Sequence, residues 1–126
     1  LLIKKNKLEN HIKLLGLRND IPELLNKSHC LLMPSLWEGL PLVVLEAGAS
    51  KLPMIVTPVG SIPSVLNEKN SYMCELEHFE ETMLEVINNY DAAKKKALKF
   101  HTQIKEKYSL KTVVLSHEKI YKSFGF

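Results

Sequence analysis

Two glutamates in an otherwise apolar segment are the feature that most constrains the fold of this chain. The segment, residues 34–47, reads Pro-Ser-Leu-Trp-Glu-Gly-Leu-Pro-Leu-Val-Val-Leu-Glu-Ala, and seven residues separate Glu38 from Glu46. Residues 29–33, just before it, are an apolar run typical of a buried strand, and residues 42–50 are expected to be helical. An ionised carboxylate in such surroundings needs hydrogen-bond partners, so we expect Glu46 to be desolvated and to bind ligand hydroxyls.

The start of this helix is predicted to bind an anion. Pro41 is expected at the first helical position, where proline is favoured because that position needs no N–H donor. The amides of Leu42 and Val43 then have no partner within the helix, and they point outward with the positive end of the helix dipole. Gly39 lets the backbone approach a ligand closely. A phosphate held between two carboxylates is therefore the predicted chemistry of this corner.

Composition excludes several other classes of protein. The sequence has no glycine-rich phosphate loop ending in Lys-Ser or Lys-Thr, no His-Glu-x-x-His and no Gly-x-Ser-x-Gly. It has no long apolar run of the kind that spans a membrane, and its lysines lack the interleaved aromatics of single-strand binders. Cys30 and Cys74 show no metal-ligand spacing and are expected to be reduced core thiols. We therefore expect a cytoplasmic α/β protein with no metal site and no nucleic-acid partner.

The last part of the sequence predicts three helices of unequal charge. Residues 75–85 are acidic and residues 94–107 are rich in lysine, and both segments carry apolar residues at helical spacing. The lysine-rich face has two interpretations, a solvated helix surface or a contact with anionic lipid. Ser109 is the expected N-cap of a C-terminal helix over residues 109–126. One face of that helix is predicted to hold Leu110, Val113, Val114, His117, Tyr121 and Phe124.

An ordered series of motifs from residue 11 to about residue 121 resembles the C-terminal, donor-binding half of retaining glycosyltransferases of the GT-B fold. The matching segments are a strand ending in glycine at residues 11–16, a short helix at 20–28, the loop with Pro34-Ser35 and Glu38-Gly39, the E-x7-E closure at Glu46-Ala47, a strand at 52–57 and a turn at 59–63. The resemblance implies a Rossmann-like, mainly parallel sheet with helices on both faces. It also implies that residues 1–126 are one partial domain, truncated at its N-terminal side.

The resemblance assigns roles to particular residues. Glu38 matches a glutamate that lies beside the donor sugar and is the expected catalytic residue, while Glu46 matches one that accepts hydrogen bonds from the nucleotide ribose. The backbone around Leu40 would hold the sugar and the diphosphate, and the loop at residues 16–17 would border the nucleobase. The donor-binding residues implied in this way are Gly16, Leu17, Glu38, Gly39, Leu40, Pro41, Leu42, Val43 and Glu46.

The implied activity is transfer of a hexosyl group, with retention, from a UDP- or GDP-linked donor to an acceptor hydroxyl, without a metal or other cofactor. The acceptor, a glycan or glycolipid, would be bound by a separate N-terminal domain, so this chain alone is expected to be inactive. The expected setting is bacterial polysaccharide or lipopolysaccharide synthesis, with possible peripheral contact at the inner face of the cytoplasmic membrane.

Two alternatives remain open. Residues 51, 61 and 71 are Lys, Ser and Ser where the family usually has glycine, which also fits a binding or interaction module that has lost turnover. The glutamates also have a purely structural interpretation: Glu38 as a helix cap and Glu46 as the ion-pair partner of Lys51 or Arg18. Trp37 is expected to wall the pocket or fill the core rather than to stack on a base.

Overall fold

The computed structural model describes residues 2–125. The elements in chain order are α1 (Leu2–Lys5), α2 (Ile21–Lys27), β1 (Leu31–Met33), α3 (Leu42–Ala49), β2 (Met54–Val56), α4 (Ile62–Val65), β3 (Tyr72–Met73), a 3-10 turn (Leu76–His78), α5 (Phe79–Asn88), α6 (Tyr90–Lys107) and α7 (Leu110–Ser123). The predicted strands at residues 29–33 and 52–57 are confirmed in shortened form, as is the short helix at residues 20–28.

The three strands form one parallel sheet in the order β1-β2-β3. Leu31 pairs with Met54 at the start of the first ladder, and Ile55 pairs with Tyr72 in the second. Because neighbouring strands are parallel, each connection must cross back over the sheet. Helix α3 makes the first crossing and α4 the second, which places the carboxyl ends of all three strands at one edge.

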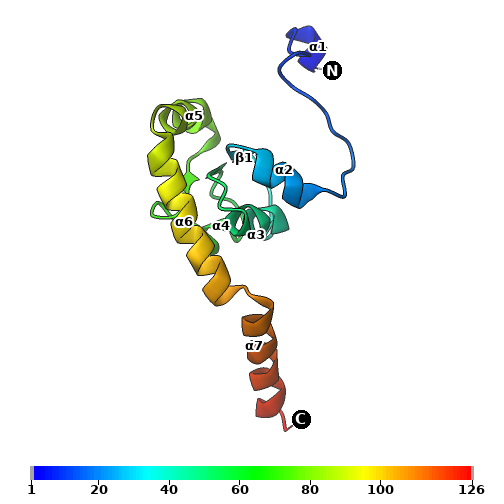
Figure 1. Cartoon of the computed structure of the whole chain (residues 1–126), viewed down its shortest axis with the longest axis vertical. Helices are drawn as coiled ribbons and strands as arrows, with labels where there is room; N and C mark the ends of the chain where they lie inside the picture. The colour runs from blue at the N-terminus through cyan, green and yellow to red at the C-terminus, as the bar shows by residue number, and fades with distance from the viewer. Residues whose placement is uncertain (1, 126) are drawn as a thin grey trace.

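Side chains of the central strand β2 alternate between two apolar cores. Met54 and Val56 belong to the core that includes residues of α3, α4 and α6, whereas Ile55 belongs to the core that includes Phe79 and Val86 of α5. Successive side chains of a strand point to opposite faces of the sheet. When all of them are buried, helices must cover both faces. The predicted Rossmann-like sheet with helices on both faces is confirmed (Figure 1).

Helices α3 and α6 approach each other closely at Gly48. A Cβ at this position would lie 2.4 Å from Cε1 of the fully buried Phe100 and 2.9 Å from Cγ1 of Ile104. The His101 ring nitrogen Nδ1 lies 3.1 Å from the carbonyl oxygen of Gly48 at the end of α3. The long helix α6 thus fixes the position of α3, whose other end carries the candidate site.

Residues 11–16 do not form the strand that the resemblance implies. They lie in the extended connection between α1 and α2 (Figure 1), and Ile12, Leu14 and Leu15 are all exposed. A β-strand needs a neighbouring strand to pair its N–H and C=O groups. No strand of the described residues 2–125 pairs with this segment, so its apolar residues alone do not make it a strand.

The C-terminal helix predicted over residues 109–126 is confirmed in shortened form as α7, with Ser109 as its N-cap, and residue 126 lies outside the described residues. The Ser109 hydroxyl accepts a hydrogen bond from the amide of Thr112 at 3.3 Å. None of the α7 residues is buried, and Leu110 and Phe124 are 80% and 75% exposed. The apolar face predicted for this helix therefore lies open to solvent. Across the described residues, no helix is long and apolar enough to span a bilayer.

The lysine-rich helix α6 has the predicted apolar face, made by Ala93, Ala97, Phe100 and Ile104. Lys96 differs from the solvated surface or lipid contact expected of the lysine-rich face. The Lys96 ammonium donates to the carbonyl of Ser71 at 3.1 Å and lies 3.7 Å from the centre of the Tyr72 ring. The pKa of Lys96 is lowered, mainly because burial disfavours its charged form. The lysine joins α6 to the start of β3 through a cation–π contact.

Candidate functional site

Two loops meet where β1 and β2 end. Residues 34–41 follow β1 and residues 57–61 follow β2. The Thr57 hydroxyl donates to the carbonyl of Ser35 at 2.5 Å, and the amide of Ser61 donates to the carbonyl of Gly39 at 2.9 Å. Ligands of open parallel α/β sheets bind outside the carboxyl ends of the strands. The loop that carries Glu38 is therefore fastened to the neighbouring loop at the edge where such ligands bind.

Gly60 makes this loop contact possible. It has φ +58°, and a Cβ built on it would lie 2.0 Å from the carbonyl oxygen of Glu38 and 2.7 Å from that of Gly39. A side chain at this position is strained by the left-handed backbone and clashes with main-chain atoms. Gly60 thus sets how the backbone of Glu38 lies against the second loop.

The carboxylate of Glu38 is held from its own loop. The Ser35 hydroxyl donates to Glu38 Oε1 at 2.8 Å, and Glu38 is half-buried. The alternative in which Glu38 caps the following helix is wrong, because the N-cap of α3 is Pro41 and that cap has no side-chain hydrogen bond. The Glu38 carboxylate therefore does not cap the helix and can accept hydrogen bonds from a ligand.

Helix α3 begins at Leu42, the first residue of the predicted range 42–50, so the expectation that Pro41 is the first helical residue is wrong. Pro41 is the N-cap, with ψ 125°, and the first helical residue is Leu42. The Pro41 carbonyl accepts from the amide of Val44 at 3.1 Å, and within residues 2–125 the amides of Leu42 and Val43 donate no backbone hydrogen bond. These two N–H groups lie at the positive end of the helix dipole, the arrangement that binds phosphate.

Glu46 is exposed, contrary to the expectation that it would be desolvated. The buried face of α3 is made by Val44, Ala47 and Gly48, and Glu46 projects from the other side of the helix. It lies four residues after Leu42, hence on the same face as the first helical residue. The structural alternative is also wrong, since no ion pair joins Glu46 to another described residue, and Arg18 pairs with Asp20.

The structure gathers residues 38–46 at one corner, and the other predicted site residues lie in the connection between α1 and α2. Gly16 has φ +64° and Leu17 is 99% exposed, and within residues 2–125 no hydrogen bond joins either to the loop that carries Glu38. Of the two places expected for Trp37, the wall of the pocket and the core, its exposure of 90% excludes the core. Leu36 and Leu40 of the same loop are also exposed, whereas Met33 before it and Val44 after it lie in the core.

Of the glycines that the resemblance leads one to expect, only the one at position 51 meets a left-handed backbone. Lys51 has φ +57°, a conformation that costs roughly 1–2 kcal/mol for a residue with a Cβ. Ser61 has φ −90°, and Ser71 is not among the described residues of positive φ. Serine therefore fits positions 61 and 71 without backbone strain.

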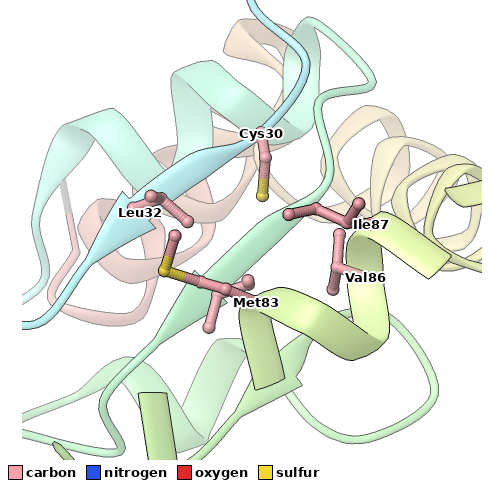
Figure 2. Close-up of a pocket in the computed structure, with 6 residues that line it drawn as sticks. Cys30, Leu32, Met83, Val86 and Ile87 are labelled. Carbon is pink, nitrogen blue, oxygen red and sulfur yellow. The ribbon is translucent and has the colours of Figure 1, made fainter. Parts of the chain in front are cut away.

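A small apolar pocket lies on the face of the sheet that α5 covers, between the strands and this helix (Figure 2). It measures about 170 Å³ and is lined by Cys30, Leu32, Ile55, Met83, Val86 and Ile87. Sequence reasoning missed it, although the signal was present. Cys30 and Leu32 alternate along one strand, and Met83, Val86 and Ile87 recur at helical spacing in α5.

The Cys30 thiol in this pocket is expected to react slowly. Burial is the main reason that the pKa of Cys30 is raised to about 11, from an ordinary value of about 8.5. At pH 8 the thiolate fraction, and with it the rate of alkylation by iodoacetamide, should be on the order of 100-fold lower than in the urea-unfolded chain. A Cys74→Ser variant isolates the signal of Cys30, and equal rates in the folded and unfolded chains would contradict this burial.

Comparison with known proteins assigns this chain to a family. The sequence profile described as "Glycosyl transferases group 1" matches residues 1–89. Over 74 residues the chain is 43% identical to an Escherichia coli UDP-Gal:alpha-D-GlcNAc-diphosphoundecaprenol alpha-1,3-galactosyltransferase, a match that covers 58% of this chain and 19% of that protein. Over 124 residues it is 32% identical to the gpi3 subunit of the Schizosaccharomyces pombe phosphatidylinositol N-acetylglucosaminyltransferase, covering 95% of this chain and 27% of that subunit.

Solved structures agree on the fold. A sucrose-phosphate synthase from Thermosynechococcus elongatus superimposes with a TM-score of 0.89 at 16% identity, covering 98% of this chain and 32% of the synthase. Anabaena HepE in complex with UDP gives a TM-score of 0.89 at 20% identity, covering 96% and 35%. The chain thus spans about a third of these proteins and 19% to 27% of the two sequence relatives above. With the family profile covering most of its length, this chain belongs to the group 1 glycosyl transferases and has the GT-B, Rossmann-like fold.

Proposed function

We propose that the whole protein transfers a hexosyl group, with retention, from a UDP- or GDP-linked donor to an acceptor hydroxyl, and that this chain supplies the donor site. The observation that carries the proposal is the corner at the start of α3. Glu38 stands before the free amides of Leu42 and Val43, and Glu46 stands one turn after them, at the carboxyl edge of a parallel sheet. A nucleotide donor is supported by a sequence relative named for UDP-Gal and by the solved complexes of HepE with UDP and UDP-glucose.

Each group at this corner suits one portion of such a donor. The amides and the helix dipole stabilise the charge that develops on the diphosphate when its bond to the sugar breaks. The acceptor oxygen bonds to the same carbon and gives up its proton to the departing diphosphate. Glu38 accepts hydrogen bonds from the sugar hydroxyls and Glu46 from the ribose hydroxyls. Within this proposal the charge of the diphosphate is neutralised by protein groups, with no metal ion required.

The acceptor is proposed to be a glycan or glycolipid of a bacterial polysaccharide or lipopolysaccharide pathway. The E. coli relative is named for an acceptor linked to diphosphoundecaprenol and the S. pombe relative for phosphatidylinositol, both of which are lipids. An enzyme that acts on such acceptors works at a membrane surface. The proposed location is accordingly the cytoplasm, with peripheral contact at the inner face of the cytoplasmic membrane.

The lysines on the outer face of α6 are the proposed lipid contact. Lys95, Lys99 and Lys105 are exposed, and each basic residue near an anionic bilayer contributes about 1 kcal/mol to binding. Replacing all three by glutamine should lower affinity for vesicles that contain phosphatidylserine by about 100-fold, as measured by co-sedimentation. The same change at the exposed Lys4, Lys13 and Lys27 should have little effect. Equal binding of both triple variants would show that α6 does not contact lipid.

Ligand-observed NMR of this chain with UDP, GDP, ADP and their hexose conjugates tests the donor site. Glu46→Ala should weaken binding of the preferred nucleotide by about 10- to 100-fold, because a hydrogen bond to a charged group is worth roughly 1.5–3 kcal/mol. Glu118→Ala, which removes an exposed carboxylate of α7, serves as the matched control. An effect of Glu46→Ala no larger than that of the control would refute the assignment of the ribose to Glu46.

The alternative is a binding or interaction module of the same fold that has lost turnover. The observation that favours it is Lys51, a residue with a Cβ in a left-handed backbone where the family usually has glycine. Lys51 lies between α3 and β2, at the end of α3 away from Glu38. The two proposals differ in one assay: a module binds nucleotide sugar without releasing nucleoside diphosphate, and an enzyme releases it when an acceptor is present.

A further inference from the structure

Two successive hydrogen bonds connect the end of β2 to the carboxylate of Glu38. Thr57 is only 3% exposed, and its hydroxyl donates to the carbonyl of Ser35 at 2.5 Å. The hydroxyl of Ser35 then donates to Glu38 Oε1 at 2.8 Å. The amide of Thr57 also donates to the carbonyl of Met33, at 3.2 Å, so both the start of the loop and Ser35 are tied to β2. The position of the Glu38 side chain is thus fixed from the core of the sheet.

These bonds leave one carboxylate oxygen for a ligand. Within residues 2–125 no hydrogen bond reaches Glu38 Oε2, while Oε1 is held by Ser35. A free glutamate side chain samples several rotamers, and ordering it on binding costs free energy. A glutamate already oriented by a neighbouring hydroxyl avoids most of that cost, so its second oxygen can accept from a ligand hydroxyl without further ordering.

We infer that Ser35 is a positioning residue that orients Glu38 toward the hydroxyls of the donor sugar, with Thr57 holding the backbone of Ser35. This inference rests on the proposed function, because it needs a sugar beside Glu38. It predicts an effect confined to the sugar portion of the donor. The nucleotide and diphosphate contacts belong to Glu46 and to the amides at the start of α3, which neither hydroxyl touches.

The hydrogen bond from Ser35 to Glu38 is not needed for the helix that follows. The N-cap of α3 is Pro41, without a side-chain cap, and Ser35 and Glu38 both precede it in the loop. Ser35 is half-buried, so loss of its hydroxyl leaves no large cavity. If Ser35 served only stability, its loss would weaken the binding of nucleotide and of nucleotide sugar alike. A positioning role would weaken only the binding of the nucleotide sugar.

Calorimetry on the whole protein tests the inference with UDP, GDP and their hexose conjugates as probes. The measured quantity is the affinity for the conjugate divided by the affinity for the nucleotide alone. Ser35→Ala should lower this ratio about tenfold, the size expected for loss of one charge-assisted hydrogen bond, with nucleotide affinity unchanged. Ser35→Thr, which keeps the hydroxyl, should preserve the ratio. Thr57→Val should lower it and Thr57→Ser should not.

A double-mutant cycle supplies the second readout. In a Glu38→Ala background, Ser35→Ala should cause no further change in the ratio, because the serine acts only through the glutamate. A tenfold additional loss in that background would overturn the inference, as would a Ser35→Ala variant whose nucleotide affinity falls in parallel with its conjugate affinity. Wild-type protein that binds none of the nucleotides would instead refute the proposed function, and the inference with it.

Discussion

Glu38→Ala should lower the rate of hexosyl transfer by the whole protein about 100-fold. Its carboxylate is half-buried, held by Ser35, and placed before the free amides of α3. Alanine removes the acceptor for the sugar hydroxyls, and a hydrogen bond to a charged group in such a site is worth roughly 1.5–3 kcal/mol. If these bonds strengthen as the diphosphate leaves, the loss appears mainly in kcat.

The rate is measured by release of nucleoside diphosphate in the presence of acceptor. Glu118→Ala, which removes an exposed carboxylate of α7, is the matched control and should retain the wild-type rate. A thermal melt of both variants excludes unfolding as the cause. Full transfer activity in folded Glu38→Ala protein would end the assignment of the donor sugar to this residue.

Gly60→Ala is expected to have the largest effect on stability and to disturb the site as well. The added Cβ meets the carbonyl oxygen of Glu38 at 2.0 Å, in a backbone of φ +58°. The left-handed conformation costs roughly 1–2 kcal/mol and relief of the clash costs a similar amount. We expect the free energy of unfolding to fall by about 2–4 kcal/mol, measured by urea denaturation.

Gly39→Ala is the matched control for that substitution. A Cβ at Gly39 would meet no atom within 4 Å, and its φ lies outside the left-handed region. Its unfolding free energy should change by no more than about 1 kcal/mol. Because Gly60 sets the backbone of Glu38, donor binding should also weaken in Gly60→Ala protein that is still folded. Equal stability of the two variants would mean that the loops do not pack as described.

The corner of the site could be predicted because its signals are local. A short apolar run ending at Pro34 predicts a strand, Pro41 predicts a helix start, and the spacing of Glu38 and Glu46 places one carboxylate on each side. In the structure Pro41 is the N-cap rather than the first helical residue, and the predicted order is kept. Patterns read over a few residues therefore sufficed to locate the candidate site.

The failed predictions concern properties that depend on distant residues. The exposure of Glu46 could not be read from a helix whose first four residues are all apolar, because periodicity does not then show which face is buried. Residues 11–16 resemble a strand of the family but have no pairing neighbour among the described strands. The links from Thr57 to Ser35 and from Gly60 to Glu38 join loops about 22 residues apart, and no local pattern encodes such contacts.

The most direct test of the donor site is a titration of isotope-labelled chain, followed by the backbone amide resonances, with UDP- and GDP-hexoses. The account predicts that the largest chemical-shift changes fall on residues 38–46, above all on the free amides of Leu42 and Val43. Changes centred on the apolar pocket between the strands and α5, with the start of α3 unaffected, would contradict it.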